Sequence, residues 1–151
     1  MRSLKSVGLV AVVASLALVV GACSSGSTST PKTLSVSDAW ARAQADTAAN
    51  SAAYLTISNP TGQDDALLSA SSPVGMVEMH HTTTDASGMT GMSPVDKIAV
   101  PAGGTVVLEP GGFHLMLMSL TKPLAVGDQV ELDLVFEHAG KITVQAEVKS
   151  S

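Results

Sequence analysis

Methionine and histidine gather in one segment of the chain. Six of the seven methionines and three of the four histidines lie between residues 76 and 118. They are Met76, Met79, Met89, Met92, Met116 and Met118, with His80, His81 and His114. Methionine-rich cores are common, but imidazole nitrogen combined with thioether sulfur suits copper(I). Neither donor must lose a proton from a group of high pKa, and thioethers do not pair into disulfides in an oxidising compartment. The segment therefore predicts a copper(I) site.

The second half of this segment has a clear strand pattern. In Phe113–Met118 successive side chains point to opposite faces, so His114, Met116 and Met118 share one face. The turn residues 110–112 come directly before and place His114 near a strand end, where a ligand can meet solvent or a partner. We expect His114 and Met116 to bind the metal and Met118 to pack.

The first half leaves the choice of histidine open. Strand alternation groups Met76, Glu78 and His80 on one face and Val77, Met79 and His81 on the other. Adjacent histidines cannot face the same way in a regular strand. If His81 already belongs to the loop that carries Met89 and Met92, alternation no longer constrains it.

The elements that must position these residues are short strands. From Thr33 onward, apolar or alternating runs of strand length recur between turn signals such as residues 59–62, 102–104 and 126–128. No stretch of ten residues in this part has a helical stripe. Eight or nine such strands predict an all-β sandwich or barrel.

The amino-terminal segment is typical of an export signal. Arg2 and Lys5 precede an uncharged run over 7–20 that is shorter than the roughly 20 residues a spanning helix needs. Residues 20–23 resemble a bacterial lipobox ending at Cys23, the only cysteine. We expect three parts: a signal peptide over 1–22, lipidated Cys23 with a flexible tether over 23–32, and one domain over 33–151. Such a chain is anchored at the outer face of the cytoplasmic membrane.

Charge and motif content exclude several classes of function. The net charge is −5, and removal of Arg2 and Lys5 makes it −7, which argues against nucleic acid as a partner. The carboxylates are dispersed along the predicted strands rather than paired as a general acid and base. There is no phosphate loop, nucleophile elbow or zinc-type Cys/His spacing. We expect no enzyme activity.

The spacing of the candidate ligands resembles the PCu(A)C copper chaperone family, whose signature is H-x(10)-M-x(21)-H-x-M. His81, Met92, His114 and Met116 satisfy it. Family members commonly carry one histidine after a Val-Glu-apolar pattern, which locally aligns His80, and one inserted residue after His81 would reconcile the two. His80 is therefore the alternative first ligand. Met89 is an alternative sulfur.

The resemblance implies a fold, a cargo and a partner. The fold is a cupredoxin-like β-sandwich or barrel of Greek-key type, and the cargo is copper as Cu(I). The implied function is a monomeric metallochaperone that supplies the copper centre of cytochrome oxidase, directly or through a thiol-containing assembly factor. Copper scavenging or buffering for tolerance is the alternative. Blue-copper electron transfer would need a cysteine thiolate, and Cys23 is expected to carry lipid.

Overall fold

The computed structural model describes residues 32–150, and within them all regular structure is β. The strands are β1 Ser35–Arg42, β2 Ser51–Ser58, β3 Asp65–Ser71, β4 Met76–Thr84, β5 Thr90–Pro94, β6 Ile98–Val100, β7 Thr105–Leu108, β8 Phe113–Met118, β9 Gln129–Phe136 and β10 Gly140–Lys149. The all-β prediction is confirmed, with ten strands rather than eight or nine. The expected signal peptide, Cys23 and the tether up to residue 31 lie outside the described residues.

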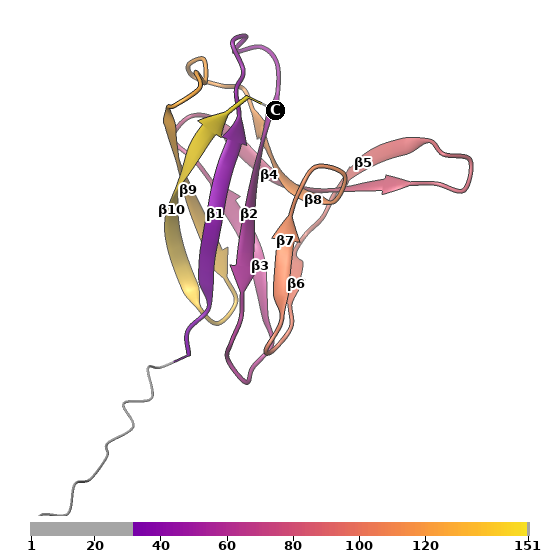
Figure 1. The fold of residues 1–151 in the computed structure, drawn as a ribbon, viewed down its shortest axis with the longest axis vertical. Helices are drawn as coiled ribbons and strands as arrows, with labels where there is room; N and C mark the ends of the chain where they lie inside the picture. Colours follow the sequence, from indigo (N-terminus) through magenta and orange to yellow (C-terminus); the bar gives the residue numbers. More distant parts are fainter. Residues whose placement is uncertain (1–31, 151) are drawn as a thin grey trace, which may run out of the picture.

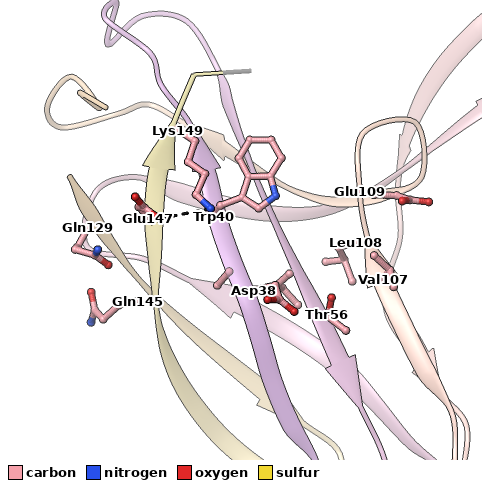
Figure 2. A pocket seen from close by; sticks show the side chains of 12 residues that line it. Asp38, Trp40, Thr56, Val107, Leu108, Glu109, Gln129, Gln145, Glu147 and Lys149 are labelled. Carbon is pink, nitrogen blue, oxygen red and sulfur yellow. Dashed lines mark ion pairs between the residues drawn. The ribbon is translucent and has the colours of Figure 1, made fainter. Parts of the chain in front are cut away.

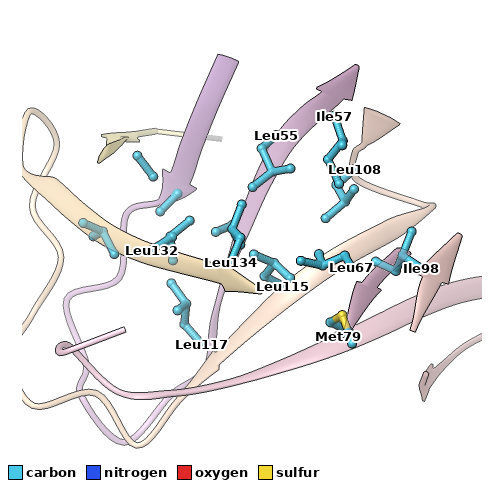
Figure 3. Packing of buried hydrophobic residues seen from close by; sticks show 14 of the residues in the cluster. Leu55, Ile57, Leu67, Met79, Ile98, Leu108, Leu115, Leu117, Leu132 and Leu134 are labelled. Atoms are coloured by element: carbon cyan, nitrogen blue, oxygen red, sulfur yellow. The ribbon is translucent and has the colours of Figure 1, made fainter. Parts of the chain in front are cut away.

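The strands form one sheet that folds over on itself. The order is β5-β4-β8-β2-β1-β10-β9-β3-β6, with β7 also paired to β2. β1 pairs antiparallel with β2 and parallel with β10. Although β8 and β9 are four places apart in this order, leucines of both strands join one buried cluster (Figure 3). The sheet therefore makes two layers with the core between them (Figure 1). Residues 32–150 contain no helix that could span a membrane.

Alternation along the strands decides what enters the core. In β9 the residues Val130, Leu132, Leu134 and Phe136 are buried while their neighbours face outward. In β8 Leu115 and Leu117 belong to the core cluster and are fully buried. Burial of one such leucine stabilises the fold by about 1.5–3 kcal/mol.

Most of the methionines are not part of this core. Met79 is the one methionine in the core cluster of the described residues, and no other methionine is among the half-buried residues packed against it. Met76, Met89 and Met92 are exposed. Core packing therefore accounts for Met79 and leaves the rest of the methionine cluster unexplained.

The β4–β5 hairpin extends sideways from the two-layered body (Figure 1). β5 pairs only with β4 and lies at the edge of the sheet. The turn is closed by Asp85, whose Oδ1 accepts hydrogen bonds from the backbone N–H groups of Ser87 and Met89 at 2.8 and 3.0 Å. All side chains of β5 are exposed.

A buried carboxylate ties the β9–β10 turn to β3. The side chain of Asp65 accepts hydrogen bonds from the backbone N–H groups of Ala66, His138 and Ala139 at 2.8, 3.0 and 2.8 Å. Burial alone would raise the pKa of this carboxyl, but the three N–H groups and the nearby His138 ring together lower it below the ordinary 3.8. The folded state therefore favours the charged carboxylate.

This arrangement predicts acid-sensitive stability. Because the folded-state pKa of Asp65 is depressed, its contribution is fully present above the ordinary pKa and is lost as the pH falls from about 5 through the folded-state value. Asp65→Asn should lower the free energy of unfolding by about 1–3 kcal/mol at neutral pH and flatten the acid limb of the stability curve. Urea unfolding at several pH values measures both the free energy of unfolding and its dependence on pH. Asp96→Asn, at an exposed aspartate, is the control. An equal effect of Asp96→Asn would contradict the conclusion that Asp65 is the source of the acid-sensitive stability.

Candidate metal centre

Antiparallel pairing of β4 with β8 sets two histidines side by side. His80 lies directly opposite His114, and Glu78 lies opposite Met116. The ring centroids of His80 and His114 are 5.8 Å apart, at an interplanar angle of 48°. The predicted face sharing within both segments is confirmed by this register. Since Met79, Leu115 and Leu117 point into the core, the histidines lie on the outer face of the sheet.

The hairpin brings a methionine to the same face. Met92 of β5 is directly opposite Thr82 of β4, and Thr82 shares a face with His80 because the two are two residues apart. Met92, His114 and Met116 all line a cleft of about 310 Å³. Arg42 and Tyr54 line the same cleft from β1 and β2.

His114 is oriented to present one nitrogen. The residue is 4% exposed, and its ring Nδ1 lies 3.2 Å from the Gly112 carbonyl oxygen. A carbonyl only accepts, so Nδ1–H donates and Nε2 carries the lone pair. Burial lowers the pKa of His114, and the nearby His80 and His81 lower it further, against the opposing effect of the Gly112 hydrogen bond. The neutral, ligand-competent imidazole is favoured.

The ring of His80 is also held by a hydrogen bond, but at Nε2 and by the side chain of Glu78. Its Nε2 lies 3.2 Å from a carboxylate oxygen of Glu78, so Nε2–H donates and Nδ1 keeps the lone pair. His80 Nδ1 is buried and has no hydrogen-bond partner within residues 32–150. A buried nitrogen without a partner is costly, and a metal ion would satisfy it. Carboxylate and carbonyl groups that fix the ring of a ligating histidine are typical of metal sites.

His81 lies on the opposite face. It pairs with Phe113 and stacks on its ring, with centroids 4.2 Å apart and an interplanar angle of 23°. β4 continues to Thr84, so His81 belongs to the strand and not to a loop, and Met92 belongs to β5. The register brings His80, not His81, together with His114.

The remaining candidate sulfurs have different surroundings. Met89 is 70% exposed next to the hairpin turn, away from the paired histidines. Met118 was expected to pack, but it is half-buried and outside the core cluster and the residues packed against it. Its partner across the ladder is Met76.

The candidate donors on this face are uncharged; Met92, His114 and Met116 line the cleft, and His80 adjoins it through its pairing with His114. Two imidazoles and the thioethers of Met92 and Met116 come from three adjacent strands, and none must release a proton. No group of three or more His, Cys, Asp or Glu side chains suited to a metal occurs in the described part of the chain. Two imidazoles and two thioethers could hold a soft, monovalent ion such as copper(I).

Sequence reasoning did not assign three neighbours of this site. Strand alternation predicts that Glu78 shares a face with His80. It does not predict the hydrogen bond between them, which depends on the side-chain rotamers. Arg42 and Tyr54 reach the cleft because β2 lies between β1 and β8. The ring of Tyr54 is 6.4 Å from that of His114. No signal along the chain links these positions.

A larger cleft of about 650 Å³ lies elsewhere, along β1, β10 and β7 (Figure 2). Trp40 and Asp38 line it, together with Glu147, which pairs with Lys149 at 3.4 Å. No histidine, methionine or cysteine lines it. It lacks the soft donors of the smaller cleft and is not a candidate for copper(I).

Comparison with solved structures gives the class of domain. The copper-bound PCuAC domain from PmoF2 aligns with a TM-score of 0.65 and 28% identity over 78% of this chain and 93% of that chain. The CuI-DR1885 solution structure from Deinococcus radiodurans aligns with a TM-score of 0.59 and 34% identity over 84% of each chain. The fold is that of PCuAC copper chaperone domains, as the resemblance implied, and is all-β and cupredoxin-like.

The sequence itself gives the family. Residues 34–148 match the family described as "Putative lipoprotein LpqE-like". "Putative lipoprotein Lxx21020" of Leifsonia xyli subsp. xyli is 33% identical over 116 residues, which cover 76% of this chain and 68% of that protein. The chain belongs to the LpqE-like family.

The hydrogen bonds predict opposite tautomers for the two histidines. At about pH 8, where imidazoles are neutral, nitrogen-15 NMR of the metal-free protein should show Nδ1–H for His114 and Nε2–H for His80. Glu78→Ala should remove the preference of His80 and leave that of His114 unchanged. Finding Nε2–H on His114, or an unchanged His80 in the variant, would contradict this orientation.

Proposed function

We propose that this protein is a copper(I) carrier whose ligands are His80, Met92, His114 and Met116. The observation that carries the proposal is the His80–His114 pair, with ring centroids 5.8 Å apart and one free nitrogen on each ring. Met116 follows His114 on the same face, and Met92 comes from the hairpin. The copper-bound PCuAC domain and CuI-DR1885, which share this fold, support the choice of metal.

Two observations favour His80 over His81 as the first ligand, although the family spacing selects His81. His80 is on the face of His114 and has a buried, unpartnered nitrogen. His81 is committed to the ring of Phe113. The extra residue between His80 and Met92 is absorbed by the exposed hairpin turn, since surface loops tolerate insertions.

The donor set suits transfer as well as binding. Without a thiolate the ion is held by neutral donors only, and Met92 is 57% exposed. An incoming ligand from a partner can therefore displace Met92 before the buried His114 and the half-buried His80 release the ion. In this proposal Cys23 is lipidated, and the domain is held at the outer face of the cytoplasmic membrane. The recipient is the copper centre of cytochrome oxidase or a thiol-containing assembly factor.

Copper(I) titration of the purified protein, followed by X-ray absorption, tests the site. The wild type should bind one tight equivalent with nitrogen and sulfur in its first shell. His80→Ala and Met92→Ala should weaken binding by tenfold or more, which is about 1.4 kcal/mol or more. His81→Ala and Met89→Leu are matched controls that should keep the affinity. A first shell without sulfur would contradict the proposed site. Loss of binding in His81→Ala alone would show that His81, and not His80, is the first ligand.

A deletion strain tests delivery. If the protein supplies the oxidase, its loss should lower cytochrome oxidase activity in low copper, and added copper should restore that activity. The chain carrying His80→Ala should fail to complement, whereas His81→Ala should complement. Normal oxidase activity with increased sensitivity to copper would instead favour scavenging or buffering.

A further inference from the structure

A second pair of methionines continues the ladder beyond the proposed copper site. Met76 lies directly opposite Met118, two residues along both strands from the Glu78–Met116 pair. Directly opposite side chains have Cβ atoms about 4.5–5.5 Å apart on the same face. Two long thioether side chains at that separation can place both sulfurs on one ion.

The core does not account for this pair. Met76 is 59% exposed, and neither methionine belongs to the core cluster or to the half-buried residues packed against it. Apolar side chains at an exposed strand end contribute little burial energy. Their shared feature is a soft donor atom.

The backbone around this pair holds the two strands closely together. A Cβ built on Gly75 would lie 2.5 Å from the carbonyl oxygen of Met118, so only glycine fits there. The backbone N–H of Thr121 donates to the carbonyl oxygen of Val74 at 2.8 Å. These contacts fix the β4–β8 register at Met76 and Met118. The two side chains are therefore held opposite each other before an ion binds.

We propose that Met76 and Met118 form a second copper(I) site, with Met116 as a ligand shared with the first. Met116 is diagonal to Met76, at a Cβ separation of about 7–8 Å that long side chains can span. The choice of ion rests on the proposed function. The second site has thioether donors only and lacks the two oriented imidazoles, so it binds more weakly than the first.

The shared ligand gives copper(I) a path along the face. An ion held by Met76 and Met118 forms a bond to Met116, then gains His114 as the bonds to Met76 and Met118 break. The ion stays copper(I) throughout and no proton moves, because every donor is neutral. The Met76–Met118 site is thus an entry or exit position at the opposite end of the site from the hairpin.

Methionine methyl NMR of the full chain during anaerobic copper(I) titration tests the second site. The first equivalent should shift the methyl signals of Met92 and Met116. The second equivalent should shift those of Met76 and Met118, and Met89 should not move. Met76→Leu and Met118→Leu should each abolish the second event and leave the first unchanged, with Met89→Leu as the control.

The outcomes separate the two proposals. If the signals of Met76 and Met118 stay unmoved through two equivalents, or if the leucine variants keep the second event, the second site does not exist. If Met76 and Met118 respond together with Met92 in the first equivalent, there is one site rather than two. If Met76 and Met118 respond while Met92 never does, the second site stands and the proposed function fails.

Discussion

The register between β4 and β8 determines which donor atoms can meet. Side chains alternate between the two faces of a strand, so a shift of one residue would turn every donor of one strand to the other face. In the observed register the outer face carries three consecutive pairs: Met76 with Met118, Glu78 with Met116, and His80 with His114. A slipped β4 would put Met79 and His81 on that face and would send His80 into the core.

The hydrophobic core enforces this register. Four of the donors on the outer face have a buried neighbour in sequence: Met79 is beside His80, Leu115 lies between His114 and Met116, and Leu117 precedes Met118. Exposing those apolar side chains would cost about 1.5–3 kcal/mol each. Close packing of β4 against β8 at Gly75 adds a steric constraint at one end, and stacking of His81 on Phe113 adds an apolar contact at the other. The geometry of the proposed metal centre therefore depends on residues that are not among its proposed ligands.

These relations explain what the sequence could predict. Alternation gave the faces of residues 76–81 and 113–118 correctly, because within one strand the face depends only on counting by two. Neither alternation nor motif spacing could decide between His80 and His81. The motif spacing counts residues through the β4–β5 hairpin, whose turn can gain one residue without moving the strands. Arg42 and Tyr54 could not be assigned to the cleft, because their place depends on which strands lie side by side. The amino-terminal expectations concern residues outside the described structure and stay predictions.

Charge around the cleft bears on which ion the donors prefer. Four neutral ligands leave the full charge of the ion to be balanced by its surroundings, which include the carboxylate of Glu78, 3.2 Å from Nε2 of His80. A monovalent ion therefore leaves less positive charge to be balanced than a divalent ion does. Arg42, an exposed residue, also lines the cleft, and its positive charge repels a divalent ion more than a monovalent one. Donor softness and local charge thus both favour copper(I). The exposed thioether of Met92 then leaves a way for a partner's ligand to reach the ion.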